Sequence, residues 1–140
     1  IKNGAPFRAF QSEVDRFCEE NREHSGLGDK IRALSGVANR LWELAGELKN
    51  RMRSDPLQWA SYTYPALIAF GEIAMAWRLL DMAVIAWPAS RKSGKESDFY
   101  TGKVMQATWF VDMTLPHTLA TIETCCRHGR EIADMPENAF

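Results

Sequence analysis

Cysteine is scarce in this chain, and its three cysteines form no recognisable pattern. The 140 residues contain Cys18 and the adjacent Cys125 and Cys126. An odd number without Cys-x-x-Cys spacing excludes a disulfide framework, a zinc ribbon and a dithiol redox centre. We therefore predict three reduced thiols that act as small apolar residues in a cytoplasmic protein. Because Arg127 adjoins the pair, a reactive thiolate at one of the two positions is the alternative.

The sequence also lacks an excess of basic charge. Its 17 lysines and arginines balance 18 aspartates and glutamates, which gives a formal net charge of -1. Binding to nucleic acid or to a membrane surface needs a concentrated positive field. We therefore expect no nucleic-acid partner and no membrane-surface role.

No uninterrupted apolar run is long enough to cross a membrane. Residues 66–88 have the length, but Glu72, Arg78 and Asp81 interrupt them. Each charge costs roughly 2.5–3.5 kcal/mol at a bilayer centre, so we expect a deeply buried helix and no membrane span. The chain begins at Ile1 without a leader pattern, which favours a piece excised from a longer polypeptide or a processed chain.

Patterns that bind metals, phosphates or nucleotides are missing as well. A di-metal site in a helical bundle needs Glu-x-x-His pairs, because residues three apart share one face. None of His24, His117 and His128 has a glutamate three residues before it. Gly102 and Lys103 lie inside a helical pattern and lack the further glycines of a phosphate loop. We predict no catalytic, cofactor-binding or metal-binding residue in this chain.

What the sequence does contain is helical periodicity almost throughout. We predict an all-α fold, an up-down-up-down antiparallel four-helix bundle with long, partly kinked helices, in one domain over residues 1–140. The first helix starts at Pro6, and the second has Asp29 as its N-cap. The second helix carries an apolar seam in alternating steps of four and three residues, made by Leu27, Ile31, Leu34, Ala38, Leu41, Ala45, Leu48 and Met52.

Prolines divide the next part of the chain. Asp55 as cap and Pro56 as first residue predict a new helical segment. Pro65 then either kinks that segment or begins a third long helix over residues 65–87. Pro88 and the polar loop that follows it end the third helix.

The fourth helix is predicted from a cap at Ser97 or Asp98 to an end near Gly129, with an interruption at Pro116. Its apolar face combines aromatic residues before the proline with smaller ones after it. The predicted members are Phe99, Val104, Trp109, Phe110, Met113, Leu119, Ile122, Cys125 and Cys126.

The third helix is the best candidate for a functional surface. It is apolar on nearly all sides, and such a helix must be buried on nearly all sides. A four-helix bundle leaves each helix an outward side, so we predict contact with another domain or subunit; a simple core with a few exposed large residues is the alternative. The predicted interface residues, rich in types enriched at interfaces, are Phe70, Ile73, Trp77, Leu80, Val84 and Trp87.

Two expectations concern the charges of this third helix. Arg78 lies three residues before Asp81, so the two are predicted to pair. Glu72 lies on the opposite side of the helix from Asp81. We expect Glu72 to be solvated or to reach a neighbouring domain.

The last third of the chain has a characteristic order of short motifs. Residues 99–103 read Phe-Tyr-Thr-Gly-Lys, an aromatic pair follows at Trp109 and Phe110, then Leu115 and Pro116. The chain closes on Pro-Glu-Asn-Ala-Phe over residues 136–140. With the helices before it, this order resembles the extra C-terminal helical domain of one subgroup of acyl-CoA dehydrogenases.

The resemblance implies a function that this chain does not carry out alone. The parent would be an FAD-dependent oxidoreductase that desaturates an acyl-CoA between its α and β carbons and passes electrons to an electron-transfer flavoprotein. This chain would be its non-catalytic C-terminal domain, inactive and without FAD by itself. It would pack on the upstream catalytic domains, support a homo-oligomer or shield the acyl site. The alternative is a stand-alone helical module for protein-protein interaction.

Overall fold

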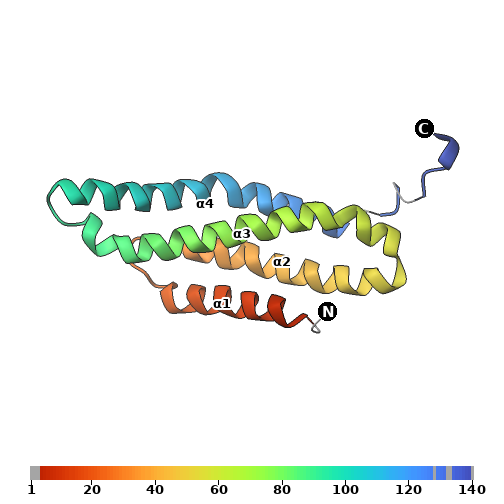
Figure 1. The fold of residues 1–140 in the computed structure, drawn as a ribbon, viewed down its shortest axis with the longest axis horizontal. Coiled ribbons are helices and arrows are strands. Elements are labelled where there is room, and N and C mark those ends of the chain that lie inside the picture. The colour runs from red at the N-terminus through yellow and green to blue at the C-terminus, as the bar shows by residue number, and fades with distance from the viewer. Residues whose placement is uncertain (1–3, 128, 132–133, 140) are drawn as a thin grey trace.

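The computed structural model describes residues 4–127, 129–131 and 134–139, and these residues form helices and no strand. Four long helices follow one another: α1 (Ala5–Asn21), α2 (Gly28–Ser54), α3 (Pro56–Ser90) and α4 (Lys95–Arg127). A short 3-10 turn, η2 (Glu137–Ala139), lies beyond the end of the bundle (Figure 1). Chain direction reverses from each helix to the next, so the predicted all-α, up-down-up-down arrangement is confirmed. No described helix combines the length and apolarity needed to span a membrane.

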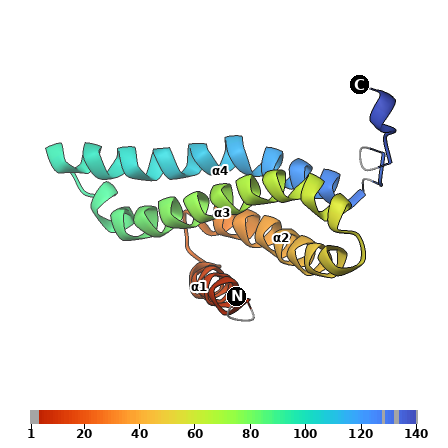
Figure 2. The ribbon, with the colours of Figure 1, turned by 45° about the vertical axis from the view of Figure 1, so that its right-hand side comes forward.

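The four helices do not contribute equally. α3 and α4 form the most extensive pair, and α2 packs against both. The shorter α1 packs on α2, touches α3 and, within the described residues, makes no contact with α4. Figure 2 shows α1 nearly end-on while α3 and α4 remain side-on, so α1 crosses these two helices obliquely. The bundle is thus a three-helix core with α1 laid across one side of it.

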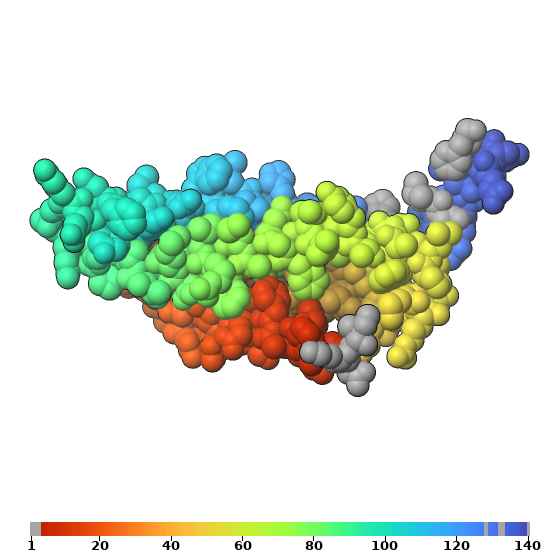
Figure 3. Space-filling view, in the orientation of Figure 1, coloured from red at the N-terminus to blue at the C-terminus, as the bar shows by residue number. Residues whose placement is uncertain are grey.

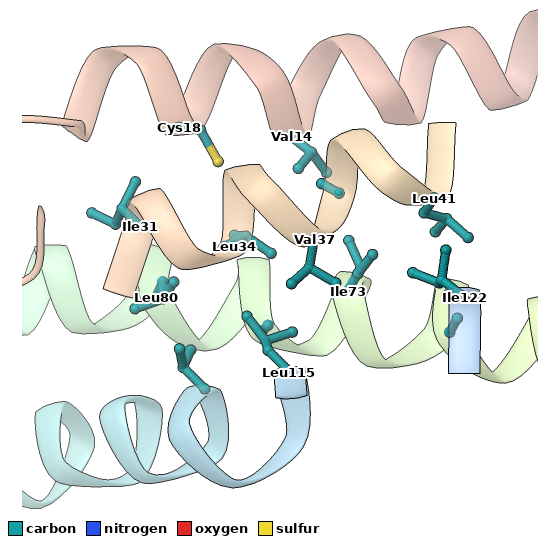
Figure 4. Packing of buried hydrophobic residues seen from close by; sticks show 14 of the residues in the cluster. Val14, Cys18, Ile31, Leu34, Val37, Leu41, Ile73, Leu80, Leu115 and Ile122 are labelled. Atoms are coloured by element: carbon teal, nitrogen blue, oxygen red, sulfur yellow. The ribbon is translucent and has the colours of Figure 1, made fainter. Parts of the chain in front are cut away.

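The predicted seam of α2 forms the centre of the core. Six of its eight residues are buried, and Val37 and Leu44 widen the buried face. Figure 4 shows Ile31, Leu34 and Leu41 turned toward side chains from the other helices. Met52, in the last turn, is instead 46% exposed. The seam could be predicted from the sequence because only one face of α2 is apolar.

The start of α3 follows the sequence prediction, and its later course does not. Asp55 accepts a hydrogen bond from the backbone N–H of Gln58 at 3.2 Å, with Pro56 at the first helical position. The helix then runs unbroken through both Pro65 and Pro88. A mid-helix proline removes one backbone hydrogen bond, and packing along the length of α3 maintains the helix despite that loss.

Two further helix starts differ from the sequence prediction. α2 begins at Gly28, with Asp29 in its first turn rather than at the cap, where the carboxylate pairs with Arg32. α4 begins at Lys95, before the predicted cap, because Gly94 has a φ of 134° and turns the chain there. α4 also continues through Pro116 and ends at Arg127.

The predicted face of α4 is only partly confirmed. Ile122 and Cys125 are buried, and four other predicted residues pack half-buried against the core: Val104, Phe110, Leu119 and Cys126. The remaining three are exposed. Phe99, Trp109 and Met113 are 62%, 64% and 53% exposed. Smaller residues take the inward positions: Ala107, Val111, Leu115, Thr118, Ile122 and Cys125. The buried face of α3 also consists mostly of small side chains: Ala66, Ala69, Ile73, Ala76, Leu80 and Ala83. Small side chains let two helices approach closely, so α3 and α4 exclude the bulky residues from their contact.

Candidate functional site

The described residues hold no candidate metal-binding cluster. No group of three or more histidine, cysteine, aspartate or glutamate side chains converges there. The Nδ1 atom of His24 accepts hydrogen bonds from the backbone N–H groups of Gly26 and Leu27, at 3.3 and 3.2 Å. His24 therefore stabilises the turn between α1 and α2. His117 is exposed on α4, and His128 lies outside the described residues.

The cysteines are thiols held away from reactivity. All three are free, Cys18 and Cys125 are buried, and Cys126 is half-buried. Burial, with help from the carboxylate of Asp15, raises the pKa of Cys18 to about 12. Burial is also the main cause of the raised pKa of Cys125 and of Cys126. A thiolate is the nucleophilic form, so the raised pKa values favour the less reactive protonated thiol at neutral pH.

Ion pairs between distant segments fix the helices relative to one another. Arg40 of α2 binds Glu123 of α4 through Nε at 2.7 Å. Toward the other end of the α2–α4 contact, Lys30 pairs with Asp112. Sequence reasoning did not find these pairs, because their members lie more than 80 positions apart and follow no local spacing.

Contacts with distant segments also fix the end of α4. Arg51 of α2 donates to the carbonyl oxygens of Cys125 and Cys126 at 3.3 and 3.4 Å, which satisfies acceptors that a helix end leaves free. Just beyond, Arg130 pairs with Asp55, the cap of α3. The final segment therefore returns to the turn between α2 and α3.

The Arg40–Glu123 and Arg130–Asp55 pairs predict that the fold loses stability in acid. The hydrogen bond from Arg40 lowers the pKa of Glu123, and the hydrogen bond from Arg130 is the main cause of the lowered pKa of Asp55. A carboxylate whose pKa is lowered on folding stabilises the fold above its unfolded pKa of about 4, and that contribution disappears as pH falls through the folded value. We expect Glu123→Gln to lower the thermal midpoint at pH 7, and the difference from wild type to shrink progressively below about pH 4.

Thermal melts at a series of pH values check this prediction. Glu20→Gln, on the exposed side of α1, is the matched control and should leave the midpoint unchanged at pH 7. A difference between wild type and Glu123→Gln that stays constant down to about pH 2 would contradict the linkage.

The three charged residues of α3 all have partners within the chain. Arg78 pairs with Asp81 at 3.0 Å, as predicted, and its guanidinium lies 5.1 Å from the ring centre of Trp77. Glu72 makes a contact within the bundle that the sequence did not predict. It is half-buried and accepts a hydrogen bond from the hydroxyl of Thr118 at 2.7 Å. Among the described residues, Thr118 is the one polar residue that is fully buried.

The predicted interface residues of α3 divide between the core and its margin. Ile73 and Leu80 are fully buried inside the chain. Phe70, Trp77, Val84 and Trp87 are half-buried and pack against the core. The rings of Phe70 and Trp77 meet Phe10 of α1, and the ring of Trp87 stands edge-on to His24 at 5.3 Å. α1 thus covers much of the face that the sequence assigned to another domain or subunit.

Other apolar side chains of α3 and α4 lie on the surface instead. Figure 3 shows α3 running uncovered across one face of the molecule, between α4 and α1. Its large exposed residues are Leu57, Tyr64, Leu67, Ile68, Met75 and Ile85. Those of α4 are Phe99, Met105, Trp109 and Met113. This surface is a second candidate site of interaction, beside the half-buried residues of the predicted face.

A shallow groove separates α2 from α4 on another side, where α1 does not reach. Its volume is about 590 Å³. Val37, Val111, Leu115 and Leu119 line it with apolar atoms, and the Arg40–Glu123 pair lies at its edge. Such a groove offers hydrophobic contact but few free polar groups to orient a ligand.

Comparison with protein-family models matches residues 10–136 to the family described as acetyl-CoA dehydrogenase C-terminal like. The chain belongs to this family. The match extends the resemblance seen in the last third of the sequence to nearly the whole chain, including the first two helices. A comparison with curated proteins found no match.

The α2–α4 groove of this acetyl-CoA dehydrogenase C-terminal-like domain lacks the groups that hold a flavin dinucleotide. A flavin dinucleotide needs converging backbone N–H groups or free cations for its pyrophosphate. At the α2–α4 groove the cation Arg40 is already bound to Glu123, and the lining is mostly apolar.

Proposed function

We propose that this chain is the non-catalytic C-terminal domain of a larger FAD-dependent acyl-CoA dehydrogenase. The parent oxidoreductase would desaturate an acyl-CoA between its α and β carbons in the cytoplasm, and would pass the electrons to an electron-transfer flavoprotein. The domain would pack on the upstream catalytic domains, contribute to the contacts of a homo-oligomer and help to shield the acyl site. All of its catalytic residues and FAD contacts would lie in those upstream domains.

The observation that carries this proposal is the group of large apolar side chains exposed on α4. Trp109 and Phe99 are 64% and 62% exposed, and Met105 and Met113 are exposed as well. Large exposed apolar surfaces mark contacts with other proteins. Membership of a C-terminal-domain family supports upstream domains of the same polypeptide as the principal partner.

The test compares the complete gene product with the 140-residue chain alone. We expect the complete product to be yellow, with a flavin spectrum that bleaches when acyl-CoA is added anaerobically. The 140-residue chain should be colourless and should bind no added FAD. A gene that encodes only this chain would contradict the proposal and would favour the stand-alone interaction module.

A variant on α4 tests the packing role separately. Trp109→Ser should lower the thermal midpoint of the complete product by several degrees, because a tryptophan buried at an interface typically contributes about 2 kcal/mol or more. The same change should barely affect the 140-residue chain, where the side chain is exposed. Gln106→Ser, an exposed position on the same helix, is the matched control. Equal effects of Trp109→Ser in the two proteins would count against a packing role for this face.

A further inference from the structure

The outer side of α3 carries a regular row of residues that its own fold leaves uncovered. The row advances in steps of four and three, so its members lie along one line of the helix. They are Tyr64, Ile68, Gly71, Met75, Arg78, Met82 and Ile85, of which Met82 is half-buried and the others are exposed. We call this set the α3 outer row. Its spacing is that of a helix that pairs with a second helix at a shallow angle.

The α3 outer row is almost neutral. Over its 35 residues α3 carries only Glu72, Arg78 and Asp81 as charged residues. Arg78 and Asp81 neutralise each other, and Glu72 turns toward Thr118 of α4. Two copies of the row can therefore meet without net repulsion. A strongly charged partner would find no complementary charge on this face.

Gly71 has no explanation within the chain. It lies in the interior of α3, where glycine lowers helix stability relative to alanine. A Cβ atom added there would meet nothing within 4 Å, so the fold does not need its small size. Its place in the middle of the α3 outer row makes it a notch between Ile68 and Met75. Long, flexible methionine side chains are suited to filling such a notch.

We propose that the α3 outer row binds the same row of a second copy of this chain, with the two α3 helices antiparallel about a two-fold axis. The alternating steps of four and three residues are almost the same from either end of the row. An isologous contact between antiparallel helices requires this, because each row meets the same row in the opposite direction. In the register that fits, Met75 of each copy fills the notch at Gly71 of the other. Tyr64 then meets Met82, and Ile68 lies against the stem of Arg78.

Charge selects this register over the next one. The alternative antiparallel alignment sets Met75 against Arg78, and it brings the two Arg78 residues within about 5 Å of each other along the axis. In the proposed alignment they are about 15 Å apart. Like charges held close in a contact of low polarity oppose association, so the alignment centred on Gly71 and Met75 is favoured.

The size of the contact predicts its strength. The row from Tyr64 to Met82 is about 27 Å long and one helix, about 10 Å, wide. Its footprint of roughly 300 Å² per copy is well below the roughly 800 Å² of stable complexes. The α3 contact alone should therefore give a weak and reversible dimer of the 140-residue chain. The inference does not depend on the flavoenzyme proposal, because it concerns this chain without flavin or substrate.

Replacement of Gly71 tests the proposal, because it should stabilise the chain and weaken its dimerisation. Gly71→Leu should raise the thermal midpoint of the dilute chain by a few degrees, because a good helix former replaces a mid-helix glycine in open space. The same variant should weaken dimerisation at least tenfold in sedimentation equilibrium, since the notch is filled. Gly46→Leu, on α2, is the matched control: its Cβ also meets nothing within 4 Å, and it should gain stability with unchanged dimerisation.

Each other outcome overturns the inference. A chain that is monomeric up to about 1 mM, the level of the weakest specific complexes, has no such contact. A dimer that Gly71→Leu leaves as strong as before uses another face. The register has its own check, an oxidised mixture of Gly71→Cys and Met75→Cys chains. A disulfide between the two variants should form in excess over the disulfides within either one, and the reverse result rejects the alignment.

Discussion

Ile73→Ala is expected to lower the free energy of unfolding by about 2–5 kcal/mol, and the thermal midpoint by roughly 10 °C. Ile73 is fully buried in the core between α3 and its neighbours, and Figure 4 shows its side chain pointing toward Val37 of α2. Removal of its outer carbon atoms leaves a cavity among closely packed helices. Chemical denaturation of the dilute chain, where dimerisation is negligible, measures the loss directly.

The same helix provides the matched control. Ile85→Ala makes the same chemical change at a residue that is 74% exposed, so it should alter the free energy of unfolding by no more than about 0.5 kcal/mol. The pair separates the inner and outer faces of α3. Similar losses at the two positions would mean that α3 is oriented differently about its axis, and the candidate surface would have to be reassigned.

Gly26→Ala is expected to destabilise the chain by about 1–3 kcal/mol, although the residue is exposed in a turn. A Cβ atom at this position would lie 1.9 Å from Cη2 of Trp87, far inside van der Waals contact. The indole cannot move freely, because His24 packs on it and Arg91 lies 5.0 Å from its ring centre. Thermal or chemical unfolding should show the loss, which an average surface alanine substitution would not produce.

A double-mutant cycle identifies the cause of that loss. In the background of Trp87→Ala the ring is gone, so Gly26→Ala should have little further effect. Gly102→Ala on α4, where an added Cβ meets nothing within 4 Å, should instead stabilise the chain by about 0.5–1 kcal/mol. If Gly26→Ala costs the same in both backgrounds, the close approach of Trp87 is not its cause.

The fold could be predicted from the sequence where a helix has one apolar face. α2 shows this, because its seam distinguishes inside from outside and places Leu34 and Leu41 in the core. α3 and α4 gave no such distinction. α3 is apolar nearly all round, so its outward face was assigned from residue types that are enriched at interfaces. In the structure α1 covers Phe70 and Trp77, and rows of alanine face the neighbouring helices.

The large exposed residues of α3 lie on another side of the helix from the predicted interface residues, of which Ile73 and Leu80 are buried. Close helix packing needs small residues, and that requirement moved Trp109 and Met113 outward on α4 as it moved Met75 outward on α3. An alanine row at helical spacing is the sequence signal that could have located the inner face. The local pair Arg78–Asp81 was predictable from its spacing of three, whereas Arg40–Glu123 required the tertiary structure.

The hydrogen bond from Thr118 to Glu72 has a consequence for how α3 and α4 find their alignment. Alanine repeats along α3 present nearly the same shape after every turn, so shape alone tolerates a slip of one turn, about 5.4 Å. Such a slip would separate the half-buried carboxylate of Glu72 from its donor, although the Thr118 hydroxyl would keep its bond to the carbonyl oxygen of Thr114 in the same helix. Loss of a hydrogen-bond partner by a buried polar group costs about 1–3 kcal/mol, and more when the group is charged. Together with the contact of Thr101 with the carbonyl oxygen of Ser90, this polar contact favours a single sliding position for the longest helix pair of the bundle.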